Sequence, residues 1–205
     1  MKAETAGAVR PTDPFEVVEY DPAWATQFAD EQAQLRQALG GLVEDIEHVG
    51  STSIPGLAAK PIIDIQLVVS DFSNLAECVE KMQSLGYVYL GLSGIEGREY
   101  FVKHRVHTHM VQRGNDEYMR KRLFLQYLRN NEQARSEYSE LKKRLAAEWA
   151  GHPDCQNRYN IDKTEFIMGA LGNAGWDTSR KPLYLRQLEN GTHEPQTSSG
   201  ISREH

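Results

Sequence analysis

Apolar residues recur along the chain with two periods, which predict a mixture of helices and strands. Between Trp24 and Leu39 the large apolar residues fall at the spacing of one helical face. The run from Ile62 to Val69 is almost continuously apolar, which is typical of a central strand covered by helices. Further strands are predicted at 15–20, 46–49, 87–90, 99–103 and 106–112, and further helices at 73–85, 116–129, 132–149 and 159–171.

These elements predict one domain, at residues 15–176, whose C-terminal part is helical. The segment 1–14 mixes Ala, Gly, Thr and Pro without periodicity, and we expect a flexible arm. The segment 177–205 is polar and turn-rich, as expected of a disordered tail. Ser73 is expected to cap the helix that follows it.

The composition is that of an ordinary soluble protein and argues against one class of partner. The chain has 205 residues, with 23 Lys and Arg against 29 Asp and Glu, so its formal net charge is −6. Broad binding to a nucleic-acid backbone rewards a basic face, which this balance does not favour. A local basic pocket for one phosphorylated small molecule is compatible with it.

Cysteine usage and the lack of long apolar segments indicate the cytoplasm. Cys78 and Cys155 lie far apart, which argues against a disulfide framework and favours a reducing compartment. Residues 1–14 lack the apolar core of a signal peptide, and no stretch approaches the roughly 20 apolar residues of a membrane span. We therefore expect a cytoplasmic protein without a membrane partner.

The segment from His48 to Gln66 has the most informative chemical pattern. A strand ends in a Gly-Ser turn, small residues follow, and a second strand begins. Gly50 lets a ligand approach the backbone closely because it has no Cβ. The next residues offer hydroxyls, free amides if a helix starts there, and one positive charge, all of which suit phosphate. They are Ser51, Thr52, Ser53 and Lys60.

Asp64 interrupts the apolar strand. Strand alternation places Ile62, Asp64 and Gln66 on one face of the sheet. A carboxylate in this position is costly unless it meets a cation or hydrogen-bond donors. A magnesium ion that bridges to phosphates would serve, and a structural ion pair with Arg98 or Arg105 is the alternative. The Gly-Ser turn also has a structural alternative, a simple helix cap, but turn and acid together favour a functional site.

Two histidines extend this pattern. His107 and His109 are two residues apart on a predicted strand and therefore share a face. With His48 and Asp64 nearby in the predicted sheet, they could form a metal site, for which imidazole favours zinc, manganese or iron. The alternative is a pair of hydrogen-bonded or phosphate-binding histidines.

Residues on the predicted helices are further candidates. The basic residues at 120–122 and Arg129 could line a phosphate pocket, or they could form a solvated helix face balanced by glutamates. Tyr159 and Lys163 lie four residues apart on one helical face and could reach a ligand. The alternative is a packed tyrosine beside an exposed lysine.

With these residues in view, the sequence resembles the GrpB family of the nucleotidyltransferase superfamily. The run from His48 to Asp64 looks like the family signature, and the resemblance extends from about Phe15 to Trp176. It implies a nucleotidyltransferase-like α/β (α+β) fold, a mixed sheet flanked by helices with a helical C-terminal segment. The other matching residues are Arg98–Phe101, His107–Val111, Phe124, Tyr127–Arg129, Tyr138, Leu141-Lys142, Tyr159 and Lys163.

The resemblance also implies a chemistry. Gly50 and Ser51 would contact the phosphates of a nucleotide, and Asp64 would be the catalytic acid and a ligand of magnesium or manganese. The sequence departs from the superfamily pattern at Gln66, where a second acid is expected. The later strand carries histidines instead of a third acid, so ordinary two-magnesium catalysis lacks two of its ligands.

Three hypotheses for function follow. The first is a nucleotidyltransferase-like protein that binds a nucleotide or phosphorylated metabolite and transfers a nucleotidyl group with a divalent metal, with Lys60 or Arg98 neutralising charge. The second is a non-catalytic module for a nucleotide or coenzyme A-type ligand, since GrpB-like domains occur fused to dephospho-coenzyme A kinase. The third is a metal-dependent hydrolase that uses His107, His109 and Asp64.

Overall fold

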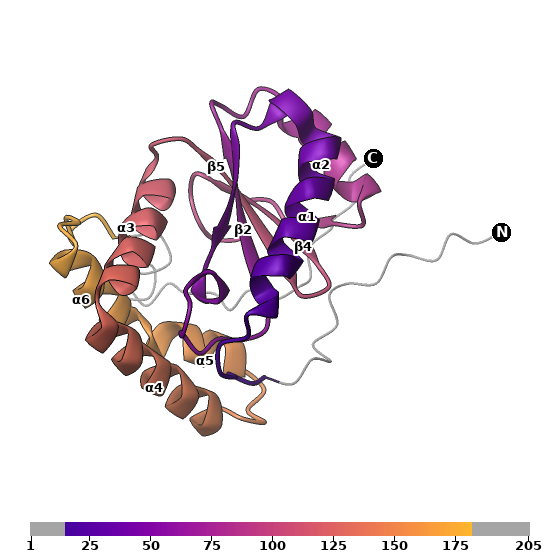
Figure 1. Cartoon of the computed structure of the whole chain (residues 1–205). Coiled ribbons are helices and arrows are strands. Elements are labelled where there is room, and N and C mark those ends of the chain that lie inside the picture. The colour runs from indigo at the N-terminus through magenta and orange to yellow at the C-terminus, as the bar shows by residue number, and fades with distance from the viewer. Residues whose placement is uncertain (1–14, 182–205) are drawn as a thin grey trace.

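The structure is a computed structural model of the chain, and it describes residues 15–181. The predicted arm at 1–14 and the predicted tail from residue 182 onward lie outside the described residues. In the described part, a five-stranded sheet lies between two groups of helices (Figure 1). The predicted class, a mixed sheet flanked by helices with a helical C-terminal segment, is confirmed.

The sheet has the strand order β1-β2-β5-β4-β3. β2 and β5 are parallel, whereas the other neighbouring strands are antiparallel. In this register Asp64 of β2 lies opposite Val49 on one side and His107 on the other. The strands are β1 Asp45–Val49, β2 Ile63–Val69, β3 Val88–Tyr89, β4 Arg98–Lys103 and β5 Val106–Gln112.

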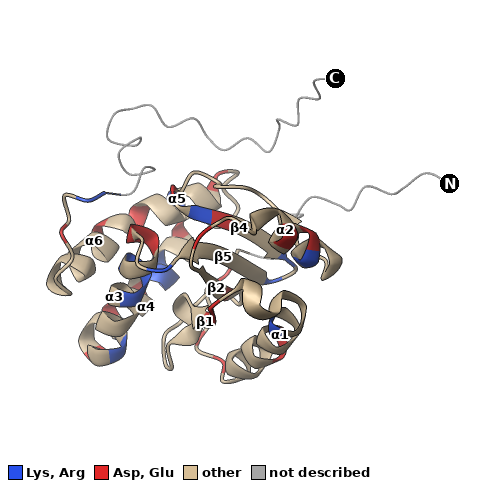
Figure 2. Ribbon diagram, turned by 90° about the horizontal axis from the view of Figure 1, so that it is seen from above, with Lys and Arg blue, Asp and Glu red and all other residues tan. Residues whose placement is uncertain are grey.

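Two helices, α1 (Ala23–Leu39) and α2 (Leu75–Ser84), lie on one face of the sheet (Figure 2). Alternate residues of β2 point toward them, and these are the apolar ones: Ile63, Ile65 and Leu67. They are buried in one cluster with apolar residues of both helices, which forms the main core. The predicted alternation of β2 is therefore confirmed.

The other helices lie beyond the opposite face of the sheet (Figures 1 and 2). They have a separate apolar cluster, which includes Leu125, Leu128 and Tyr138. The sheet face that they approach is largely polar, and the functional candidates lie on it. Among the described residues, no helix is both long and apolar enough to cross a bilayer. These helices are α3 Asp116–Asn130, α4 Glu132–Glu148, α5 Cys155–Asp162 and α6 Thr164–Asn173.

Three sequence predictions need correction. The predicted strand at 15–20 forms only one isolated bridge, between Val18 and Ala59. The single helix predicted at 159–171 is two helices, α5 and α6, that meet at Lys163. Ser73 does not cap α2, because Asn74 occupies the N-cap position and the helix has no side-chain cap among the described residues. Ser73 lies in a turn before the helix, where its N–H donates to the Asp71 carboxylate at 2.8 Å. The loop after β1 also contains a short 3₁₀ helix, η2 (Ser51–Ser53), and another, η1 (Gly40–Leu42), follows α1.

Asn115 joins α3 to the loop before β4. Its Oδ1 accepts a hydrogen bond from the Tyr118 N–H at 2.8 Å, and its Nδ2 donates to the Gly97 carbonyl at 2.7 Å. We expect Asn115→Ala to lower the free energy of unfolding by about 1–2 kcal/mol, because it removes the cap and a second hydrogen bond. Urea unfolding measures this, with the exposed Asn130→Ala at the other end of α3 as the control. Equal losses in the two variants would contradict the assignment.

Candidate functional site

Gly50 and Asp64 meet where β1 ends. Val49, the last residue of β1, lies opposite Asp64, and Gly50 follows it with φ +70°. A Cβ at this position would lie 2.2 Å from Asp64 Oδ2. Glycine is therefore required twice, for its positive φ and for the room that the carboxylate occupies. The turn and the acid, which are separate in the sequence, form one feature of the structure.

Asp64 faces both histidines of β5. His109 Nε2 lies 3.4 Å and His107 Nδ1 3.9 Å from Asp64 Oδ1. On the other side of the imidazole, Arg98 Nη1 lies 3.4 Å from His109 Nδ1. Because a guanidinium only donates, Nδ1 accepts, and the proton of a neutral His109 lies on Nε2, from which it is donated to Asp64. Arg98 thus acts on Asp64 through His109, and the predicted direct ion pair with this arginine is not formed.

The charge states follow from these contacts. Burial opposes ionisation of Asp64, but the hydrogen bond from His109 and the nearby positive charges bring its pKa down to about 2. Burial, together with the positive charge of Lys121, lowers the pKa of His109 to about 4 against the effect of Asp64. At neutral pH the pair is an ionised carboxylate and a neutral imidazole.

Arg98 is held by its own loop and by an aromatic ring. Its Nη2 donates to the carbonyls of Leu92 at 3.2 Å and Ser93 at 3.0 Å. Its Cζ lies 4.6 Å from the centroid of Tyr100, and that ring stacks on His109 at 5.1 Å. The loop between β3 and β4 therefore fixes the position and tautomer of His109.

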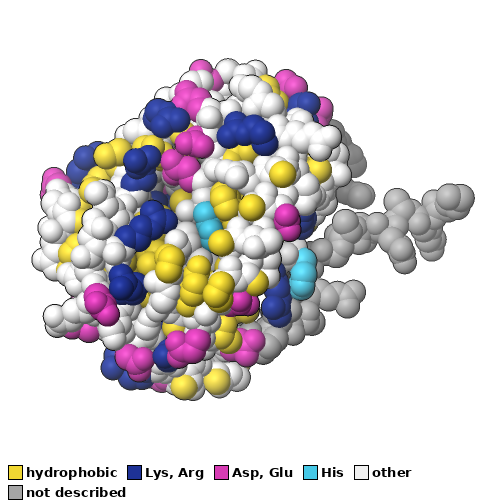
Figure 3. Space-filling view, viewed as in Figure 1, with side chains coloured by type: hydrophobic (Ala, Val, Ile, Leu, Met, Phe, Trp, Pro, Cys, Tyr) yellow, Lys and Arg dark blue, Asp and Glu magenta, His cyan; other side chains and the backbone are white. Residues whose placement is uncertain are grey.

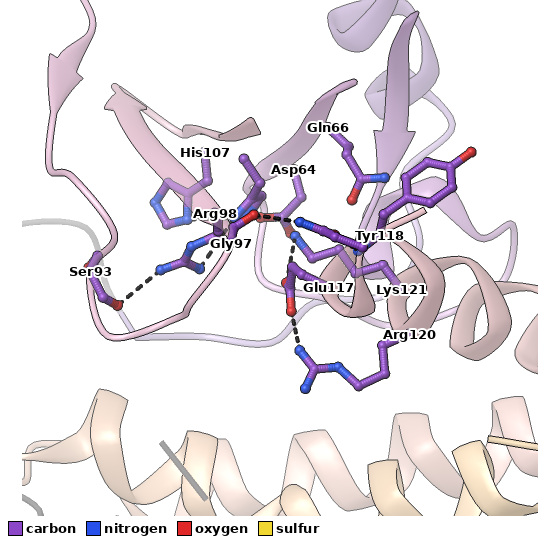
Figure 4. A network of polar contacts seen from close by, with 12 residues as sticks. Asp64, Gln66, Ser93, Gly97, Arg98, His107, Glu117, Tyr118, Arg120 and Lys121 are labelled. Carbon is purple, nitrogen blue, oxygen red and sulfur yellow. Dashed lines mark hydrogen bonds and ion pairs between the residues drawn. The ribbon is translucent and has the colours of Figure 1, made fainter. Parts of the chain in front are cut away.

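Helix α3 supplies the opposite wall (Figure 4). Glu117 is buried and pairs with Arg120 and, at 3.4 Å, with Lys121. Burial opposes ionisation of Glu117, but these two cations lower its pKa to about 2. The Lys121 ammonium makes no hydrogen bond to the described residues, and its charge also acts on Asp64. The Lys121 ammonium therefore has N–H groups that could donate hydrogen bonds to a ligand in the site.

A cavity of about 300 Å³ lies between the Gly-Ser turn and helices α3 and α6. Gly50, Ser51 and Asp64 line it from the sheet, and Arg120 and Lys121 from α3. Its remaining wall is mostly apolar and comes from α3, α4 and α6. The space-filling view shows Lys and Arg side chains gathered along the α3 side of this face, near a histidine (Figure 3). The cavity thus combines a charged end with an apolar wall.

Comparison with known proteins decides the family. A family model described as GrpB protein matches residues 14–173. The chain belongs to the GrpB family. It is 38% identical over 188 residues to the UPF0157 protein YqkA of Bacillus subtilis strain 168. That match covers 85% of this chain and 54% of YqkA, so the chain spans about half the length of this relative.

Two further relatives place this GrpB chain in context. The crystal structure of conserved protein GrpB from Enterococcus faecalis matches with a TM-score of 0.70 and 38% identity, over 77% of this chain and 96% of that one. A segment of 77 residues is 38% identical to a dephospho-CoA kinase of Mycolicibacterium paratuberculosis, which is 36% of this chain and 19% of that protein.

Two of the three hydroxyl groups after Gly50, those of Thr52 and Ser53, form hydrogen bonds with the backbone near the turn. Thr52 is buried and donates to the Ile62 carbonyl at 3.2 Å. Ser53 donates to the Gly50 carbonyl at 2.8 Å and accepts from Arg129 at 3.2 Å. Of the three hydroxyl residues, Ser51 is the one that lines the cavity.

His48 lies away from the other proposed metal ligands. It pairs with Ile65 in the sheet and therefore faces α1, whereas Asp64 faces α3. There it stacks on Phe28 at 4.7 Å and bonds to Thr52 Oγ1 at 3.1 Å. Within residues 15–181, no group of three or more His, Cys, Asp or Glu is arranged to hold a metal ion. The predicted four-residue set does not come together.

Lys60, Tyr159 and Lys163 form a second group of predicted residues. The two ammonium groups lie 5.2 Å and 4.0 Å from the centroid of the Tyr159 ring. Lys163 also lines the cavity, so this group borders the turn and Asp64. Tyr159 is buried, as the packing alternative predicts, but Lys163 is only partly exposed.

Glu117 was not found from the sequence of this GrpB protein. It lies in the first turn of α3, where an acid is expected simply to interact with the helix dipole. The nearby Arg120 and Lys121 suggested a basic wall. Arg120 and Lys121 lie three and four residues after Glu117 on the same helix. This spacing was the signal that Glu117 would pair with them and partly neutralise their charge.

We expect Gly50→Ala to lower the free energy of unfolding by about 2–4 kcal/mol, because it adds a clash with Asp64 to the cost of a positive φ. Gly56→Ala is the matched control. Its φ is +79°, but the nearest atom to an added Cβ is 4.0 Å away, so only the backbone cost applies. Chemical denaturation compares the two, and a loss no greater at Gly50 than at Gly56 would refute the steric argument.

Stability is expected to fall as the pH falls from 6.5 toward 4. Burial lowers the pKa of both His48 and His109 to about 4, so the unfolded chain binds more protons in this window. Each histidine contributes a slope of at most about 1.4 kcal/mol per pH unit. His109→Gln removes one contribution and should flatten the dependence of the unfolding free energy on pH. An unchanged slope in urea titrations across this range would show that His109 does not titrate as described.

Proposed function

We propose that this GrpB protein binds a nucleotide or a related phosphorylated metabolite in the cavity beside Gly50. The observation that carries the proposal is the meeting of three features in one cavity. These are the Gly-Ser turn, where Gly50 and Ser51 line the cavity, an apolar wall, and cationic side chains that include Lys121 and Lys163. A ligand with an anionic end and an apolar body matches this combination.

The phosphate would lie at the charged end. Ser51 offers a hydroxyl there, and the Lys121 ammonium has donor capacity that the described residues do not use. Arg120 pairs with Glu117, and the N–H groups of its guanidinium that this ion pair does not use could also donate to the phosphate. The apolar side chains of Phe124, Leu128 and other cavity residues would face the rest of the ligand.

The residues do not fit the two-metal site that the superfamily implies. Gln66 stands where a second acid is expected, and its amide donates to Glu47 at 3.3 Å. Glu117, the other acid of the cavity, already pairs with two cations. Asp64 could hold a single magnesium ion only together with the phosphates of a ligand. Binding is therefore the function that we propose, because nucleotidyl transfer by two metal ions would need ligands that the described residues of this site do not supply.

A coenzyme A-type ligand has specific support. The similarity to part of a dephospho-CoA kinase of Mycolicibacterium paratuberculosis concerns a protein whose name denotes a phosphorylated, adenine-containing substrate. Such a ligand would bring the same phosphate and apolar groups to the cavity. Dephospho-coenzyme A is therefore tested beside the nucleotides.

We expect ATP, and to a different extent dephospho-coenzyme A, to raise the melting temperature of the protein, because a ligand that binds only the folded state stabilises it. Ser51→Ala should reduce the shift, whereas Ser73→Ala, a serine outside the cavity, should not. Addition of magnesium or manganese tests a metal-bridged mode, which Asp64→Asn would remove. No shift with any of these ligands, at millimolar concentration, would contradict the proposed function.

A further inference from the structure

Three lysines from distant parts of the chain converge beside the cavity. Lys60 precedes β2, Lys142 is on α4, and Lys163 lies between α5 and α6. Each of the three ammonium groups lies over a tyrosine ring. The ammonium groups of Lys60 and Lys163 lie 5.2 Å and 4.0 Å from the Tyr159 centroid, and that of Lys142 lies 4.7 Å from the Tyr138 centroid. We call these three residues the lysine cluster.

The lysine cluster has no carboxylate partner among the described residues. Lys142 donates to the Ala58 carbonyl, and Lys60 donates to Gln156 Oε1 at 2.5 Å. The Lys163 side chain makes no hydrogen bond or ion pair within residues 15–181, and its contact is the ring of Tyr159. Other lysines of the chain do pair with acids: Lys81 with Glu77, Lys103 with Glu31, Lys121 with Glu117, and Lys143 with Glu19 and Glu140.

This distribution is the reverse of what stability alone favours. An exposed ion pair contributes little, whereas a buried cation needs a counter-charge. Lys142 is 2% exposed, and the chain has 29 acidic residues from which a partner could come. Lys60 and Lys163 are partly exposed, and none of the three lysines forms an ion pair with an acid among the described residues. Such a group of like charges beside a cavity is the arrangement expected where a ligand supplies the negative charge.

The electrostatics agree with this interpretation. Burial is the main cause that lowers the pKa of Lys60 to about 8 and that of Lys142 to about 7. Burial also lowers the pKa of Lys163 well below its ordinary value, and the positive charges of the other two lysines lower it further. Asp64 opposes the shift of Lys60 and Lys163, but it does not reach either as an ion pair.

The lysine cluster borders the cavity that we assign to the phosphorylated ligand. Lys163 lines that cavity together with Gly50, Ser51 and Asp64, and the positive charges of Lys60 and Lys142 act on Lys163. A negative group near Lys163 therefore belongs to the same ligand as a phosphate at the turn. We propose that the lysine cluster is the subsite for the terminal phosphates of a nucleoside di- or triphosphate, with Lys163 as the contacting residue. This inference rests on the proposed function.

Proton uptake on binding is a consequence. The groups that face Lys163 are Lys60, Lys142, Tyr159 and Asp64, and of these only Asp64 is anionic at neutral pH. An added phosphate chain favours the protonated amines, so protons that are absent in the free protein are taken up. The affinity should fall as the pH rises above 7, because protonation then costs more.

Isothermal titration calorimetry with AMP, ADP, ATP and inorganic tripolyphosphate tests the subsite on the full chain. We expect ATP to bind about tenfold or more tighter than AMP, in line with one added charge-assisted contact of about 1.4 kcal/mol. Lys163→Met keeps the length of the side chain and breaks no ion pair. It should weaken ATP and tripolyphosphate about tenfold and leave AMP within about twofold. Lys81→Met, on α2, is the control and should change none of the four.

The outcomes separate the two proposals. Equal affinities for AMP and ATP, or a Lys163→Met variant that weakens AMP as much as ATP, would overturn the subsite and leave nucleotide binding intact. If no nucleotide binds, the proposed function fails. Binding of tripolyphosphate, and its loss in Lys163→Met, would then show whether the lysine cluster binds phosphate. Titrations in Tris and in HEPES at pH 8 give the protons exchanged. If the observed heats are identical in the two buffers, which differ in their ionisation enthalpy, no proton is taken up, and this would contradict the expected protonation of Lys163.

Discussion

The contact between Gly50 and Asp64 is the constraint on which the rest of the site depends. A carboxylate near the start of β2 is tolerated because the neighbouring turn has no Cβ and because His109 donates a hydrogen bond to it. The alternation of the strand then divides the sheet into an apolar face, which holds the main core with α1 and α2, and a polar face. Helices α3 to α6 cannot pack on that polar face through apolar contacts alone. Tyr118 of α3 packs on Val68 and Val111 of the sheet, and other apolar residues of these helices form a cluster beside the Gly-Ser turn, where the cavity lies.

Charge is distributed unevenly with respect to this cavity. The whole chain has a formal net charge of −6, yet the cavity and its surroundings hold more cations than acids. Asp64 and Glu117 are the acids that line it, and each is already engaged, Asp64 with His109 and Glu117 with two cations of α3. A local excess of positive charge inside an acidic protein favours the approach of a small anion to that part of the surface, in line with the proposed ligand. Burial is the main cause that lowers the pKa of the lysines beside the cavity, and at Lys163 the neighbouring positive charges lower the pKa further.

The local features of the site could be predicted from the sequence, but the way in which strands and helices bring them together could not. The alternation of β2 correctly separates Asp64 from its isoleucine neighbours, because period two is a property of one strand. The facing direction of His48 depends on which residue of β2 it pairs with, and that register is set across the sheet. The break between α5 and α6 at Lys163 has no proline or glycine to announce it, so a single helix was predicted. The strand predicted at 15–20 has β-forming residues, but it lies against a loop and gains one bridge. Lys142 matched the family pattern, but its place beside Lys60 and Lys163 follows only from the packing of α4.

The state of Asp64 limits the chemistry that the site can perform. General acid–base catalysis is most effective when the pKa of the group lies near the working pH, and a carboxyl group with a pKa of about 2 is far from it. Arg98 maintains this state at a distance, because it holds the acceptor nitrogen of His109 and so directs the imidazole proton to Asp64. Asp64 therefore acts as a fixed negative charge whose partner is a neutral donor. A fixed charge can hold a cation or repel a misplaced phosphate, and these are the roles that Asp64 would have in the proposed binding of a ligand.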